Sequence, residues 1–110
     1  MTQITFYKTS AGEFKGFTCD GHAGYAGFGE DIVCASISIL VINTINSLEQ
    51  ITGEQMYVES DEDSGIIRCK FVNQPLKETS RALMDSLVLG LSQIEKQYGK
   101  NYCKLTFEEV

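Results

Sequence analysis

An apolar stretch in the first half of the chain constrains the fold most strongly. From Ile32 to Ile42, nine of eleven residues are apolar when Cys34 is counted, and a helix of this composition has no side polar enough to face bulk water. Asp31 suits the N-cap position before it, and Gly53 suits the C-terminal cap. We therefore expect a helix over 31–52 that is buried on every side, against a sheet and against a second helix or another subunit.

This helix is long enough to require comparison with a membrane span, which needs ~20 predominantly apolar residues. Its second half carries polar side chains that include Asn43, Thr44, Asn46, Ser47, Glu49 and Gln50. They shorten the apolar run, so we expect no membrane partner. The chain begins with a strand-like segment, Ile4–Tyr7, rather than a basic and then apolar leader, which predicts a cytoplasmic protein with reduced cysteines.

Strand-like patterns account for much of the remaining chain. Five segments show alternation or strand-like composition, namely 4–7, about 13–19, about 55–59, 66–72 and 102–107. Cys69 occupies an inward position in the fourth segment, so it is expected in the core. Phe14 and Phe17 fall on opposite faces of a regular strand, which predicts a bulge or kink near Gly16.

A second helix is predicted from Asn73 to Gly99, with Pro75 in its first turn. Its apolar residues recur at spacings of three and four, namely Leu83, Met84, Leu87, Val88, Leu91, Ile94 and Tyr98. The order β-β-α-β-β-α-β predicts one α+β domain over residues 1–110, in two layers, with a sheet of about five strands and both helices on one face. The pattern does not predict the strand order.

The side chains best suited to catalysis lie at and just before the start of the first helix. His22, the only histidine, precedes a glycine-rich loop, and Cys34 takes the third helical position. Unpaired N–H groups and the positive end of the helix dipole favour a thiolate in the first turn. Closure of the loop would bring the imidazole within hydrogen-bond range, as a cysteine nucleophile requires. The alternative is that Cys34 is a packing residue.

No metal or cofactor is expected. The other cysteines, Cys19, Cys69 and Cys103, have no C-x₂-C spacing, and a single histidine completes no common zinc set locally. The acidic segment 61–65 has its glycine one place early for a calcium loop, and Val72 stands where a closing Glu is needed. We interpret it as a solvated turn.

Several residues are candidates to support the pair. Asp31 is expected to cap the helix and, as a second role, to orient His22. Ser38 lies four residues after Cys34 on the same helix face, where it either touches a substrate or hydrogen-bonds the preceding turn. The loop before the helix has the composition of a substrate lid or of a surface loop without a role, and its candidate lid residues are Gly24, Tyr25, Gly27, Phe28 and Gly29.

Gly21-His22-Ala23, the glycine-rich loop and Gly29–Ala35 followed by Ser38 resemble the signature of the ribosomal-processing cysteine proteases of bacteria, the Prp family. The likeness in length, element order and motif position extends over essentially the whole chain. It implies a small homodimeric endopeptidase that removes a short N-terminal extension from a large-subunit ribosomal protein. The implied catalytic dyad is His22 and Cys34, and we expect N–H groups of the first helical turn to bind the oxyanion.

The charge of the chain bears on its partners. A net charge of −6, with nine scattered Lys and Arg residues, argues against direct binding of nucleic acid and favours a basic partner such as a ribosomal protein tail. Two other functions stay open, a thiol-based redox or regulatory protein with Cys19 as the resolving thiol, and a non-enzymatic ribosome-assembly module. The apolar perimeter of helix 31–52 predicts a homodimer that buries on the order of 1,200 Å² or more.

Overall fold

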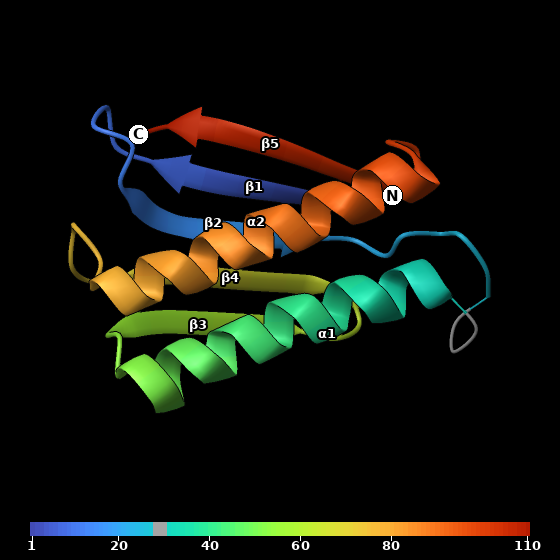
Figure 1. Ribbon diagram of the computed structural model, residues 1–110. Helices are drawn as coiled ribbons and strands as arrows, with labels where there is room; N and C mark the ends of the chain where they lie inside the picture. The colour runs from blue at the N-terminus through green and yellow to red at the C-terminus, as the bar shows by residue number, and fades with distance from the viewer. Residues whose placement is uncertain (28–30) are drawn as a thin grey trace.

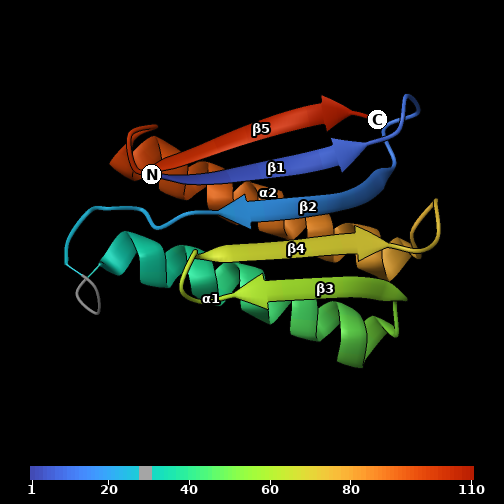
Figure 2. The same ribbon diagram turned by 180° about the vertical axis from the view of Figure 1, so that it is seen from behind.

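A five-stranded sheet forms one layer of the molecule and two helices form the other (Figure 1). The structure is a computed structural model and describes residues 1–27 and 31–110. The strands are β1 (Thr2–Lys8), β2 (Phe14–Asp20), β3 (Met56–Asp61), β4 (Ile66–Phe71) and β5 (Cys103–Glu109), in the order β3-β4-β2-β1-β5. Only β1 and β5 pair in parallel. Both helices cover the same face (Figure 2), so the predicted α+β class and element order are confirmed.

The first helix is close to its predicted bounds. Helix α1 spans Ile32–Ser47 and continues as a π-helical segment, η1, over Leu48–Thr52. Asp31 is the N-cap, and Gly53 ends the segment in the left-handed region at φ 65°, where its N–H donates to the carbonyl of Leu48. Both caps were expected from the residue types alone.

A bulge in β2 brings two phenylalanine side chains to the same face of the strand. The register of β1 against β2 shifts by one residue between Phe14 and Gly16, which confirms the predicted bulge. As a result Phe14 and Phe17 both face the core, contrary to the simple alternation, with their rings 6.3 Å and 5.9 Å from the ring of Phe6. Gly16 is required there because a Cβ would collide with the carbonyl of Cys69. Cys69 itself is buried, as predicted.

The second helix, α2, spans Glu78–Tyr98 and presents the predicted stripe to the core, with Met84, Leu87 and Leu91 fully buried. Its predicted start was wrong. The Gln74–Pro75 peptide is cis and precedes the helix. The N–H of Lys77 donates to a carboxylate oxygen of Glu54 at 3.2 Å, so this segment joins the end of η1 instead of forming a helical turn.

Within the single chain α1 is not buried on every side, and the predicted cover by another subunit stays a prediction. Val33, Ile37 and Val41 are buried, but Ile32 and Ile39 are 53 % and 69 % exposed. The sheet lies on one side of α1 and α2 lies on another (Figure 1), and the outer side that remains carries exposed apolar residues.

The polar residues in the second half of this helix also proved a weak argument against a membrane span. By length and composition, Ile32–Thr52 is the one helix among the described residues that is apolar enough to cross a membrane, a test that core helices of soluble proteins also pass. Its inner residues belong to the same core cluster as the sheet, so its packing is that of a core helix.

Candidate active site

The end of β2 fixes the position of His22. The preceding residue, Gly21, donates its N–H to the carbonyl of Gly65 at 3.0 Å, and its own carbonyl accepts from the hydroxyl of Thr2 at 3.1 Å. Gly21 has φ 91°, and a Cβ there would lie 2.7 Å from the carbonyl oxygen of Met1. His22 is thus delivered by a backbone segment held from both neighbouring strands.

The N-cap of α1 fixes the position of Cys34. One carboxylate oxygen of Asp31 accepts from the N–H of Cys34 and the other from the N–H of Tyr25, both at 2.9 Å. Partial desolvation acts to raise the pKa of this carboxyl, but the backbone N–H groups outweigh it and hold the pKa below its ordinary value. Asp31 therefore caps the helix, as expected, and ties the preceding loop to it.

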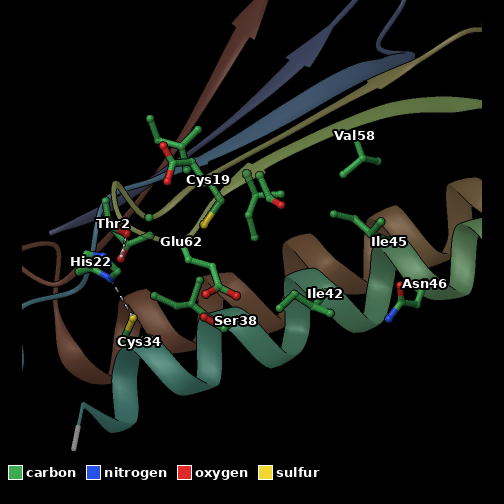
Figure 3. Close-up of a pocket in the computed structure, with 17 residues that line it drawn as sticks. Thr2, Cys19, His22, Cys34, Ser38, Ile42, Ile45, Asn46, Val58 and Glu62 are labelled. Atoms are coloured by element: carbon green, nitrogen blue, oxygen red, sulfur yellow. Dashed lines mark hydrogen bonds between the residues drawn. The ribbon is translucent and has the colours of Figure 1, made fainter. Parts of the chain in front are cut away.

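The two candidate residues meet. Sγ of Cys34 lies 3.8 Å from Nδ1 of His22 (Figure 3). Cys34 is half-buried and His22 is exposed, so a substrate can reach both. A thiol in contact with an imidazole is the arrangement that activates a cysteine nucleophile.

The pair lies at one end of a cleft of about 600 Å³ between α1 and the β3–β4 hairpin (Figure 3). From Cys34 to Asn46 the α1 wall is ~18 Å long, which matches about five extended residues. Most of the lining is apolar and comes from Cys19, Ile37, Ile42, Ile45, Val58, Ile66 and Ile67. The cleft therefore has room for an extended peptide with apolar side chains.

Ser38 lines this cleft next to the pair. The hydroxyls of Ser36 and Thr44 on the same helix each donate to a carbonyl four residues earlier. Within residues 1–27 and 31–110, Ser38 makes no such bond to the preceding turn. Of the two roles considered for Ser38, its position favours contact with a substrate.

Two of the expected oxyanion donors, the N–H groups of Cys34 and Ala35, are already engaged. The N–H of Cys34 donates to the side chain of Asp31, and the N–H of Ala35 donates to the carbonyl of Asp31. An oxyanion formed at Cys34 would compete with Asp31 for the first of these donors. Neither of these two N–H groups is a free oxyanion donor in the structure, and the oxyanion site in the first helical turn stays a prediction.

Three of the five candidate lid residues, Gly24, Tyr25 and Gly27, lie in the described chain, whereas Phe28 and Gly29 lie outside the described residues. The ring of Tyr25 packs edge-on against Tyr98 and Tyr102, at 5.5 Å and 5.2 Å between centroids. Tyr25 thus has aromatic partners within the chain, and the lid stays a prediction.

The other three cysteines differ from Cys34 in environment. Burial raises the pKa of Cys69 to about 12 and, with a smaller effect of Glu95, that of Cys103 to about 11. Burial, followed by Cys103, Cys34 and Asp20, raises the pKa of Cys19 to about 12. Cys19 shares the cleft with Cys34, yet its protonated thiol is a poor resolving nucleophile at neutral pH. Among the described residues no group of three or more His, Cys, Asp and Glu side chains is placed to hold a metal ion.

A thiol–imidazole pair at the end of a peptide-sized cleft defines a thiol hydrolase built on a small α+β domain. Residues 1–103 match the family model described as cysteine protease Prp, and the chain belongs to this family of cysteine proteases. Ribosomal processing cysteine protease Prp of Bacillus subtilis (strain 168) is 25% identical over 104 residues, covering 92% of this chain and 93% of that protein. Its counterpart in Staphylococcus aureus (strain Mu50) is 27% identical over 101 residues, covering 92% and 94%.

Solved structures share the fold over almost the whole chain. The S. aureus protease Prp in complex with a covalently linked product peptide superposes with a TM-score of 0.91 at 23% identity, covering 98% of this chain and 100% of that one. SMU.848 from Streptococcus mutans superposes with a TM-score of 0.81 at 26% identity, covering 98% and 96%.

Most residues of the cleft wall were not predicted from the sequence. Ile42 and Ile45 continue the helix face that carries Cys34 and Ser38, so the same spacing argument extended by two turns would have found them. The hairpin residues, such as Val58, gave no signal, because their approach to α1 depends on a strand order that the pattern does not reveal.

Proposed function

We propose that this cysteine protease removes a short N-terminal extension from a large-subunit ribosomal protein. The observation that carries the proposal is the contact of 3.8 Å between Cys34 and His22 at the end of an apolar cleft. The curated relatives in B. subtilis and S. aureus are named ribosomal processing proteases. Two S. aureus structures are described as complexes with a substrate peptide and with a covalently linked product peptide.

In the proposed mechanism the thiolate of Cys34 attacks the scissile carbonyl and His22 carries the proton. His22 donates its proton to the leaving amine as the peptide bond breaks and the thioester forms. It then takes a proton from the water that attacks the thioester, and the thiolate is released with the second product. Asp31 keeps the sulfur in place by fixing the start of α1.

The cleft also indicates the kind of peptide. Apolar walls along α1 suit apolar side chains on the part of the substrate that lies beside the helix. Glu62 reaches into the cleft near Ser38 (Figure 3), and the chain has a net charge of −6. A peptide with both apolar and basic residues is favoured, because the acidic protein attracts it and the cleft buries its apolar groups. A ribosomal substrate places the reaction in the cytoplasm.

The test is incubation of the purified protein with an N-terminally extended ribosomal protein, followed by measurement of intact masses. We expect loss of a short N-terminal peptide with wild-type protein and an unchanged mass with Cys34→Ser. Stable binding without cleavage would instead favour the interaction module. A reversible Cys34–Cys19 disulfide with no cleavage would favour the redox alternative.

We also propose that the protein works as a homodimer. The exposed apolar residues on the outer side of α1, Ile32 and Ile39, do not line the cleft and are suited to pack against a second copy related by a twofold axis. An interface on the order of 1,200 Å² would cover them. Light scattering at micromolar concentration is expected to give twice the chain mass of 12.2 kDa.

A further inference from the structure

The turn between β3 and β4 touches the imidazole of the dyad, although its composition indicated only a solvated turn. A Cβ built on Gly65 would lie 3.0 Å from Nε2 of His22, 3.1 Å from Cε1 of the same ring and 3.1 Å from the carbonyl carbon of Gly21. Non-bonded carbon atoms prefer separations of about 3.5–4.0 Å. A side chain at position 65 would therefore crowd the imidazole, and the ring or the backbone of Gly21 would have to move by a few tenths of an ångström to admit it.

His22 is in contact on two edges of its ring. Nδ1 faces the sulfur of Cys34 at 3.8 Å, and the edge formed by Nε2 and Cε1 lies against Gly65. A displacement of the ring away from position 65 would change the separation between Nδ1 and the sulfur. The position of the turn thus bears directly on the geometry of the dyad.

The turn is itself fixed to the strand that delivers His22. The bond from the N–H of Gly21 to the carbonyl of Gly65 extends the pairing of β2 with β4 beyond Asp20 and Ile66. Within the turn, the N–H of Asp63 donates to the side chain of Asp61 at 3.0 Å. The first bond ties Gly65 to the strand that delivers His22, and the second stabilises the turn itself.

We propose that Gly65 is a positioning residue of the dyad, required because the absence of a side chain there lets the imidazole of His22 stand with Nδ1 towards Cys34. The inference rests on the proposed roles of His22 and Cys34. Gly65 also has φ 70°, which favours glycine for backbone reasons alone. A valid test must separate this backbone effect from the contact with the ring.

The chain offers a matched control in the β1–β2 turn. Gly12 has φ 82°, and a Cβ there meets nothing within 4 Å. Gly65→Ala and Gly12→Ala therefore impose similar backbone strain, but only the first crowds His22. The primary measurement is the rate at which iodoacetamide alkylates Cys34 in the free enzyme, which needs no peptide and is unaffected by altered substrate binding.

We expect Gly65→Ala to slow alkylation and to lower kcat by about 10- to 100-fold, the scale of a misplaced catalytic group, with a smaller change in KM. Gly12→Ala should keep the wild-type values of both rates. In a His22→Ala background, Gly65→Ala should cause no further loss of alkylation rate, because the contact it disturbs is gone. If Gly65→Ala does not fold, Gly65→Asn and Gly12→Asn replace the pair, since Asn tolerates the left-handed region.

Wild-type alkylation rates in the Gly65 variants, or equal losses in the Gly12 variants, would overturn the positioning role. A fall in kcat without a fall in alkylation rate would also overturn it, since the effect would then lie in substrate binding. If instead His22 and Cys34 do not form a catalytic dyad, the result is different. The alkylation rate of Cys34 would then be unchanged by His22→Ala alone.

Discussion

Helices α1 and α2 lie side by side on the same face of the sheet, yet their outer sides differ. The outer side of α2 is mostly polar, and Leu89 is its only strongly exposed large apolar residue. The outer side of α1 exposes Ile32 and Ile39, whereas the exposed Ile42 lies on the side that lines the cleft. The core of its own chain covers the apolar residues of α2 other than Leu89, whereas α1 keeps apolar surface that this core does not cover.

Substitution of Cys34 tests whether α1 supplies the nucleophile, and we expect it to have the strongest effect on activity. Cys34→Ala should reduce peptide cleavage below detection, because Cys19, Cys69 and Cys103 are buried and cannot replace its thiol. The free energy of unfolding should change little, since Cys34 is only half-buried. Cleavage and denaturant unfolding measured on the same preparation check both points, and retained turnover would contradict the assignment of the nucleophile.

His22→Ala should come next, with a loss of about 10²–10⁴-fold in kcat, the usual scale of general acid–base catalysis. The chain has no second histidine to take over. Steady-state kinetics and the alkylation rate of Cys34 should fall together. If both stay at wild-type values, His22 is a structural residue only.

On α2 a substitution should affect stability instead. Leu87 is 2 % exposed, so Leu87→Ala should lower the free energy of unfolding by about 2–5 kcal/mol through lost burial and the cavity left behind. Leu89→Ala, on the exposed side of the same helix, is the matched control and should stay within about 0.5 kcal/mol of wild type. Equal effects at both positions would show that α2 also has a covered outer side.

The proposed dimer gives the sharpest contrast between the two outer sides. Ile39 and Leu89 are 69 % and 61 % exposed. Ile39→Glu should raise the dissociation constant of the dimer at least about tenfold, because a charge would be buried in an apolar interface, while Leu89→Glu should leave it unchanged. Sedimentation or light scattering over a dilution series measures both. A monomeric wild-type chain at every concentration would remove this explanation of the surface of α1.

The two helices also show what could be predicted from the sequence. The apolar stripe of α2 was predictable because one requirement, burial of one helix face against the sheet, determines the positions of its apolar side chains. The caps Asp31 and Gly53 were predictable because capping is local chemistry. The pairing of His22 with Cys34 was within reach because both flank one loop. The cleft, by contrast, depends on the β3–β4 hairpin, and neither its place at the sheet edge nor the contact of Gly65 with His22 follows from local pattern.

The smallest expected effect concerns the cap that joins the loop to α1. Because the folded pKa of Asp31 lies below its ordinary value of 3.8, its stabilisation is fully present above that value and is lost as the pH falls through the folded pKa. Asp31→Ala should therefore cost about 1 kcal/mol near neutral pH, and the difference from wild type should shrink below pH 3.8.

Asp31→Asn separates the charge of this residue from its capping geometry. Asn is also a good N-cap but does not titrate, so this variant should keep most of the neutral-pH stability and lose the acid dependence of the cap. Denaturant unfolding of the three proteins across the acidic range makes the comparison. A difference between wild type and Asp31→Ala that stays constant through the acid range would show that the ionised carboxylate contributes nothing beyond its shape, and the link from Tyr25 to the start of α1 would then be an incidental contact.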